Sequence, residues 1–372
     1  MSERHEFIGY RPRLDGLRTV AIGVVLLEHY GGYLAKHFLA GYYGVDLFFV
    51  ISGFLITSIL IKDQTTSFSG SYKNFIGRRI LRIFPIYYLT ITVLWITGTP
   101  SAGEMFPWLV SYTYNYGVVL TRGPDDLAPL FYLWSLSVEE QFYVFWPLLA
   151  ISMKGRKNVL FACTALLVIT SYAQLTFNLF PSMAQFNYTG LLNRMGSLGL
   201  GALGAIYVSW KSISRHFFQN VWVEAFLLLL LVVSVTSPFQ GSFVLMGLCS
   251  LFLVMKAALF GFRIGAIDRF LLNRVVVYIG SISYGIYLFH VPVGMWMTEF
   301  VFDPIWLALP WEQAGEWGAF RWHSWIIKFP LYSAASIALA ALSYRYLELP
   351  ILSLKDQWFK YGTVKAKLSE HG

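Results

Sequence analysis

Charged residues are scarce in this chain. Asp, Glu, Lys and Arg make up 13% of its 372 residues, whereas soluble domains carry about 25%. Apolar residues make up 56%, and the mean hydropathy is +0.57. This balance excludes an ordinary soluble domain and indicates a protein embedded in a lipid bilayer.

Cysteine and the common catalytic signatures are also missing or rare. The two cysteines, Cys163 and Cys249, lie inside apolar runs, so they indicate neither a disulfide framework nor a covalent acyl-cysteine. The chain lacks a P-loop, a nucleophile elbow and a cluster of metal-ligand residues. We therefore expect no metal site, and chemistry carried by single ionisable residues within the bilayer.

Ten apolar runs fill most of the sequence. Each has about 18–22 residues, the length needed to cross a hydrocarbon core of about 30 Å. We expect an all-α polytopic membrane bundle that forms one domain over 1–372, with membrane helices over roughly 15–347 and a tail at 348–372. The expected spans are 15–34, 44–62, 80–98, 131–151, 158–179, 191–209, 221–237, 241–260, 276–298 and 326–347.

The basic residues predict the orientation of these spans. An even number of spans places both termini on one side, and most Lys and Arg residues fall in segments on that side. The opposite side holds Lys36, Arg122, Arg321 and Lys328. The positive-inside rule then places both termini, and the tail, in the cytoplasm. The net charge of +8 is explained by these loops, and we expect no nucleic-acid partner.

The first span carries ionisable residues that a lipid-facing helix avoids. At about 100° and 1.5 Å per residue, Arg18 and His29 lie about 20° apart around the helix and about 16 Å apart along it. Asp15 lies on the same stripe, whereas Glu28 does not. Placing an ionisable side chain within a span costs several kcal/mol of free energy, so such residues are functional candidates. A hydrogen-bonded structural histidine is the alternative interpretation of His29.

Three other segments carry similar candidates. Arg79 and Arg82 share one helix face at the cytoplasmic end of the third span, where they either set topology or bind phosphate. Glu139 and Glu140 lie within the fourth span, which predicts a polar centre. In the ninth span, Ser283, Tyr287 and His290 share one face, which predicts cavity lining rather than simple packing.

Taken together, these segments resemble the acyltransferase-3 family of bacterial integral membrane acyltransferases. The matching pieces are Arg18 and His29 with ten residues between them, GVDLFFVISGFLI, the arginine pair before IFPIYY, WSLSVEEQFY, SYGIYLFH and YLELP. They occur in the order of the family and cover essentially the whole chain. Because the chain ends shortly after the tenth span, we expect the stand-alone form, without an extracytoplasmic hydrolase-like domain.

The resemblance implies a multi-pass protein of the bacterial cytoplasmic (inner) membrane. It implies transfer of an acyl group, usually acetyl from acetyl-CoA, to a hydroxyl of a sugar in a surface or exported glycan. The expected partners are thus acyl-CoA, a glycan or glycolipid acceptor and the bilayer. The acceptor and the acylated position stay open.

The following roles are hypotheses. Arg79 and Arg82 hold the donor phosphates, aided by Arg18 and Ser283. His29 acts as the general base, or is transiently acylated. Glu139 or Glu140 orients the imidazole, and Arg18 or Tyr287 stabilises the oxyanion.

A transporter for a glycan precursor or an acyl donor is the rival interpretation, because buried charges also mark ion and proton pathways. An arginine pair at the cytoplasmic end together with a histidine far from it favours the enzyme. In addition, no inverted repeat is evident in the sequence.

Overall fold

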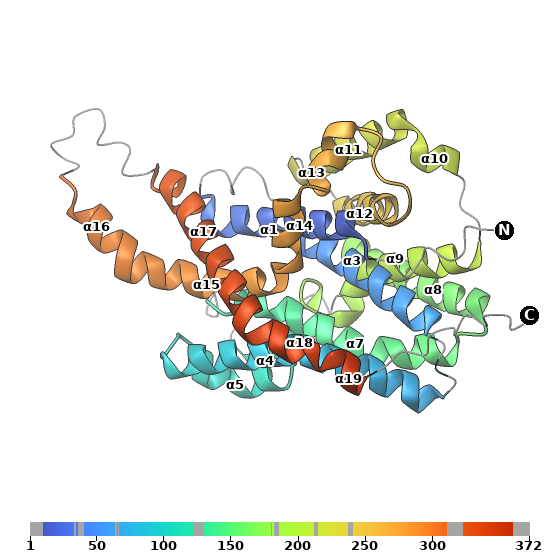
Figure 1. Ribbon diagram of the computed structural model, residues 1–372, viewed down its shortest axis with the longest axis horizontal. Coiled ribbons are helices and arrows are strands. Elements are labelled where there is room, and N and C mark those ends of the chain that lie inside the picture. Colours follow the sequence, from blue (N-terminus) through green and yellow to red (C-terminus); the bar gives the residue numbers. More distant parts are fainter. Residues whose placement is uncertain are drawn as a thin grey trace, which may run out of the picture.

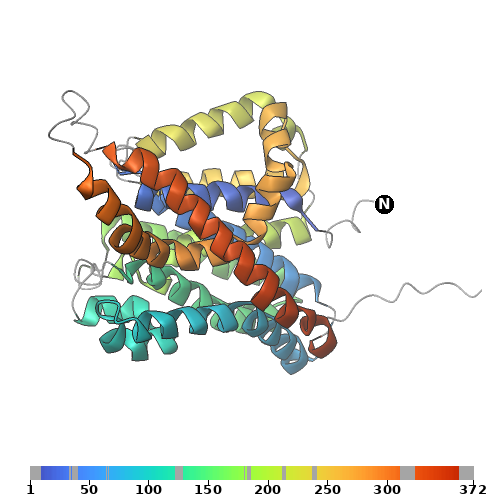
Figure 2. The ribbon, with the colours of Figure 1, turned by 60° about the vertical axis from the view of Figure 1, so that its left-hand side comes forward.

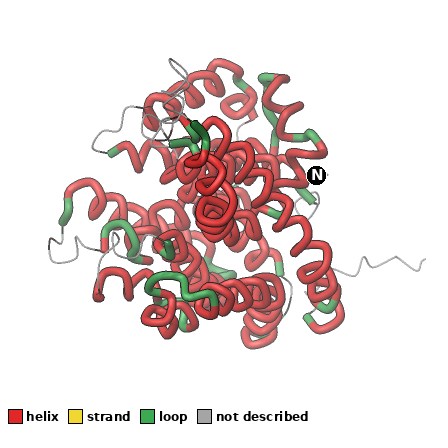
Figure 3. The backbone as a smooth tube through the Cα atoms, turned by 90° about the vertical axis from the view of Figure 1, so that its left-hand side faces the viewer, coloured by secondary structure: helices red, strands yellow, loops and turns green. Residues whose placement is uncertain are grey.

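The computed structural model describes residues 10–32, 35, 41–63, 65, 67–121, 129–179, 181, 186–211, 215–236, 241–310 and 323–359. Its regular elements are all helical, and the described residues contain no strand (Figure 3). The all-α prediction is therefore confirmed. The principal helices are α1 (Pro12–Tyr30), α3 (Gly41–Lys62), α4 (Phe68–Ile96), α7 (Trp134–Ser152), α8 (Lys157–Phe177), α9 (Leu191–Trp210), α11 (Val221–Thr236), α12 (Ser242–Leu259), α14 (Arg274–Ser281), α15 (Ser283–Met297) and α17 (Trp325–Ser343).

Each expected span coincides with one of these helices, or with the pair α14 and α15. Among the described residues, five helices are long and apolar enough to cross a membrane, and a sixth counts if this bent pair forms one span. The five are α3, α4, α8, α12 and the helix that begins with α17. The chain is thus a polytopic membrane protein. Helices α1 and α7, which both carry ionisable residues, do not meet these criteria.

Helices α3 and α9 lie side by side at the centre of the bundle, between α1 and α8 (Figure 1). Small residues make this contact possible. A Cβ atom added to Gly53 would lie 1.9 Å from the Leu198 carbonyl oxygen, and one added to Gly201 would lie 2.1 Å from that of Val50. The backbones therefore touch directly, as expected of small residues on facing membrane helices.

The prediction that 276–298 forms one continuous span is wrong, because the helix is broken within it. Helix α14 ends at Ser281, α15 begins at Ser283, and the two are bent by 72°. The bend lets α14 pack on α1, where a Cβ added to Gly280 would lie 1.8 Å from the Asp15 carbonyl oxygen. It also places Ser283 at the start of a helix that enters the bundle.

Helix α17 crosses the face of the bundle diagonally, as Figure 2 shows. It continues through a π-helical segment, Tyr344–Glu348, into α18 (Leu349–Ser353) and α19 (Lys355–Trp358). Arg78 of α4 donates a 2.6 Å hydrogen bond to the Phe359 carbonyl. The first part of the expected tail is therefore helical and packed on α4, and residues 360–372 lie outside the described part.

Several expected loops contain short helices. These are α5 (Ala102–Val110) and α6 (Tyr114–Thr121) after α4, α10 (Arg215–Gln219) after α9, α13 (Gly265–Leu271) after α12, and α16 (Asp303–Ala308) beyond α15. Helix α13 is tied to α1 by a bidentate pair in which Arg13 donates to Asp268 at 2.7 and 2.9 Å. This bond holds the pKa of Asp268 below its ordinary value.

A second ion pair is fully buried between α11 and α12. The Lys256 ammonium contacts the Glu224 carboxylate, and both residues have no exposed surface. Glu224 also accepts the backbone N–H groups of Arg263 at 2.9 Å and Ile264 at 3.1 Å. The carboxylate thus neutralises a buried cation and anchors the connection that leads to α13.

Candidate active site

A pocket opens where five helices meet: α1, α3, α4, α7 and α15. Seven of the eight residues that the sequence proposes for the site line it: Arg18, Arg79, Arg82, Glu139, Glu140, Ser283 and Tyr287. They come from four segments of the chain that are distant in sequence. The remaining wall is largely apolar and includes Phe48, Phe49 and Leu136.

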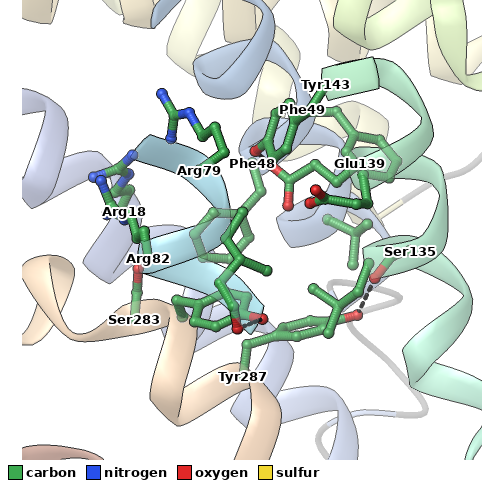
Figure 4. A pocket seen from close by; sticks show the side chains of 15 residues that line it. Arg18, Phe48, Phe49, Arg79, Arg82, Ser135, Glu139, Tyr143, Ser283 and Tyr287 are labelled. Carbon is green, nitrogen blue, oxygen red and sulfur yellow. Dashed lines mark hydrogen bonds between the residues drawn. The ribbon is translucent and has the colours of Figure 1, made fainter. Parts of the chain in front are cut away.

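One side of the pocket is basic. Figure 4 shows the side chains of Arg18, Arg79 and Arg82 gathered there, with Ser283 close to Arg82. Asp15 accepts a 3.0 Å hydrogen bond from Arg18 and so fixes that side chain. Within the described residues, neither Arg79 nor Arg82 has a carboxylate within 4.0 Å. This side therefore carries excess positive charge, which suits an anionic ligand.

Arg79 is held by aromatic rings instead of a carboxylate. Its guanidinium lies over Tyr143 and Phe75, 5.3 and 5.5 Å from the ring centroids. Such cation–π contacts position a guanidinium and leave its N–H groups available for a ligand.

Both glutamates line the pocket from α7, and Figure 4 shows Glu139 on another side from Arg18 and Arg82. Tyr143 donates a 2.5 Å hydrogen bond to Glu139, and its hydroxyl is 2.8 Å from that of Ser52. Glu140 is buried, and its Oε2 atom finds no hydrogen-bond partner among the described residues. Sequence reasoning did not identify Tyr143 or Ser52, because a tyrosine and a serine within apolar runs carry no distinctive pattern.

Tyr287 and Ser135 also line the pocket. The Tyr287 hydroxyl lies 2.6 Å from Ser135 and 2.9 Å from the carbonyl of Tyr132. The Ser135 hydroxyl is also 3.1 Å from that carbonyl. Each hydroxyl has one proton and a carbonyl only accepts, so the Tyr287 phenol donates either to the Tyr132 carbonyl or to Ser135. The phenol is therefore committed within the protein, and this does not favour the predicted oxyanion role for Tyr287.

His29 lies in the last turn of α1, outside the lining of this pocket, and its side chain is exposed. Its Nδ1 is 2.9 Å from the carbonyl of Val25. The imidazole of His290 lies against it, with ring centroids 4.6 Å apart and planes at 82°. His290 in turn contacts Tyr287, with centroids 5.3 Å apart. Side-chain contacts thus connect Tyr287, which lines the pocket, through His290 to His29.

This arrangement separates groups that the sequence hypotheses placed together. The described hydrogen bonds of His29 include neither glutamate, and Glu139 and Glu140 line the pocket with the arginines, so the orienting role proposed for them does not fit their position. Arg18 lies about 16 Å from His29 along α1, which favours donor binding over oxyanion stabilisation. Among the described residues, no three His, Cys, Asp or Glu side chains are grouped to hold a metal ion.

The fold and the site together define a membrane-embedded helical protein with a pocket that is basic on one side and, beyond Tyr287, two imidazole groups in contact. A family model described as an acyltransferase domain matches residues 11–345. The chain therefore belongs to the acyltransferase-3 family.

Two curated relatives show how far the similarity extends. The chain is 30% identical over 387 residues to a Bacillus subtilis (strain 168) protein provisionally named peptidoglycan O-acetyltransferase YrhL, an alignment that covers 94% of this chain and 56% of the relative. It is 25% identical over 373 residues to O-acetyltransferase OatA of Staphylococcus aureus (strain NCTC 8325 / PS 47), with 92% and 57% covered. The chain thus spans little more than half the length of these relatives. No solved structure matches it significantly.

Proposed function

We propose that this protein is a membrane O-acetyltransferase of the bacterial inner membrane. It takes an acetyl group from cytoplasmic acetyl-CoA and transfers it to a hydroxyl of a sugar in a cell-surface or exported glycan. The observation that carries the proposal is the pocket with three arginines, joined through Tyr287 and His290 to the exposed imidazole of His29.

The basic side of the pocket suits the phosphates of the donor. Arg79 and Arg82 have no ion-pair partner among the described residues, and guanidinium groups bind phosphate bidentately. Ser283 at the beginning of α15 adds a hydroxyl and a helix N-terminus, which also favours an anion. The separation of about 16 Å between Arg18 and His29 suits a donor whose phosphates and thioester are joined by a long flexible arm.

His29 supplies the base. Its Nδ1–H donates to the Val25 carbonyl, so Nε2 carries the lone pair in the neutral ring. Nε2 removes the proton of the acceptor hydroxyl as the hydroxyl oxygen attacks the thioester carbon. The carbon–sulfur bond then breaks, and the departing thiolate takes the proton to form free CoA.

The exposure of His29 and the names of the relatives support a glycan outside the cytoplasm as the acceptor. Because His29 is in the last turn of α1, at the end opposite to the predicted cytoplasmic side, an acceptor outside the cytoplasm can approach it. The relatives are named for O-acetyl transfer, and one name specifies peptidoglycan. Peptidoglycan fragments are therefore the first glycans to test.

The test follows free CoA with a thiol reagent in purified, detergent-solubilised protein supplied with acetyl-CoA and glycan fragments. The variant is His29→Ala, and the matched control is His216→Ala, which removes an exposed histidine of α10. We expect acceptor-dependent CoA release by the wild type and the control, and a loss of at least about 100-fold in His29→Ala, the scale of general base catalysis.

Two results would contradict the proposal. Full activity of His29→Ala would remove the proposed base. Folded wild-type protein that neither binds acetyl-CoA nor releases CoA, but moves a glycan precursor across vesicles, would establish the transporter instead.

A further inference from the structure

His290 is the one buried histidine at the site that the proposed chemistry does not use. It has no exposed surface, and it lies on α15 between Tyr287 and His29. Its Nδ1 is 2.5 Å from the carbonyl of Tyr287. Its Nε2 has no hydrogen-bond partner among the described residues. Buried polar atoms of this kind are rare in native structures and call for an explanation.

The two histidines share one tautomer. In each ring Nδ1 faces a backbone carbonyl, of Val25 for His29 and of Tyr287 for His290. A carbonyl only accepts, so both Nδ1 atoms carry the proton and both Nε2 atoms carry a lone pair. A neutral His29 therefore has no N–H to offer to Nε2 of His290, because its one N–H donates to the Val25 carbonyl.

Aromatic rings surround His290. The rings of Tyr132 and Tyr287 lie 5.1 and 5.3 Å from the imidazole, measured between centroids. These contacts hold the His290 ring in place beside His29. The rings of His29 and His290 are in contact, with centroids 4.6 Å apart and planes at 82°, so the second N–H that His29 gains on protonation comes within reach of Nε2 of His290 when the His29 ring turns.

We propose that His290 is a positioning residue that stabilises His29 in its protonated form, because its Nε2 accepts a hydrogen bond only after His29 has taken the proton of the acceptor hydroxyl. The interaction is absent in the resting protein and forms as the charge develops. Interactions of this kind accelerate the chemical step instead of tightening substrate binding. The inference rests on the proposed function.

Two variants separate this role from packing. In His290→Asn the side-chain amide still donates to the Tyr287 carbonyl, but no acceptor remains at the place of Nε2. In His290→Gln the longer side chain restores an acceptor oxygen there. We expect kcat to fall by about 10- to 150-fold in the Asn variant, the range for a hydrogen bond to a charged group. We expect substantial recovery in the Gln variant and a donor KM that changes little in both.

The same CoA-release assay decides between the roles, with thermal unfolding in detergent as a check on folding. An Asn variant as active as the wild type would show that only the Nδ1 hydrogen bond matters. Equal loss in the Asn and Gln variants would show that an acceptor at this position is not the useful feature. Either result would overturn the proposal.

A second measurement needs neither variant nor activity. NMR of the ring nitrogens in histidine-labelled wild-type protein reads the tautomer and charge of each imidazole. We expect both rings in the Nδ1–H form, and His290 to stay neutral while His29 takes up a proton. A proton on Nε2 of His290 in the neutral protein would overturn the inference. A wild-type protein that releases no CoA would contradict the proposed function, and the NMR measurement would still test the tautomers of the two histidines.

Discussion

Replacing Arg82 with glutamine tests the donor pocket directly. The change removes one of three guanidinium groups at the basic side but keeps a polar side chain of similar length. A hydrogen bond to a charged group contributes about 1.5–3 kcal/mol, and a tenfold change corresponds to about 1.4 kcal/mol. The KM for acetyl-CoA should therefore rise by about 10- to 150-fold. The fold should persist, because Arg82 has no carboxylate within 4.0 Å among the described residues.

Two donors make the assay specific. Acetyl-CoA carries the phosphates that the arginine is proposed to bind, and acetyl-pantetheine has the same thioester without them. Arg82→Gln should weaken the binding of acetyl-CoA and leave that of acetyl-pantetheine unchanged. Arg78→Gln is the matched control, because Arg78 lies on the same helix but outside the pocket lining and donates to the Phe359 carbonyl. An unchanged KM for acetyl-CoA, or an equal rise for both donors, would refute the assignment of phosphate binding to this side.

Two further predictions concern stability. Gly201→Val should destabilise the fold by about 1–3 kcal/mol or more, because even the first added carbon would overlap the backbone of α3. The control Gly23→Val should leave the stability nearly unchanged, because a Cβ at Gly23 meets no atom within 4 Å. Similar unfolding temperatures of the two variants in detergent would contradict the close helix contact. Glu224→Gln should cost about 3–5 kcal/mol, since it leaves the Lys256 ammonium buried and unpaired. Recovery of the unfolding temperature in a double variant with Lys256→Met would separate this charge effect from lost packing.

Hydropathy predicts most of the fold because the bilayer imposes a length on every crossing helix. Each of the ten expected runs contains a helix, often with ends within a few residues. What hydropathy misses is the bend at Ile282, because the sequence GSISYG remains apolar enough to continue a span. The bend goes together with a tertiary contact, the approach of Gly280 to the α1 backbone. A pattern along one segment carries no information about that contact.

The candidate site shows the same limit. Helical periodicity correctly grouped Arg79 with Arg82, and Ser283 with Tyr287, because residues on one face stay together in any packing. It could not decide which faces meet. Glu139 or Glu140 was therefore assigned to the imidazole, although the structure places both in the arginine pocket. The prediction that His290 lines the cavity is wrong, because His290 is buried outside the pocket lining. Its contact with His29 joins two helices and could not be predicted from either alone.

Helix α1 fixes the distance between the two ends of the proposed chemistry. Arg18 and His29 belong to one continuous helix, so their separation does not depend on how other helices move. Direct backbone contacts hold this helix as well: a Cβ on Gly16 would lie 2.4 Å from the Leu271 carbonyl oxygen, and one on Gly44 2.6 Å from that of Ala21. Such contacts resist sliding, because no side chain can yield between them. In the proposed mechanism the acetyl group therefore crosses this distance on the flexible arm of its donor, while helix α1 keeps Arg18 and His29 at a constant spacing.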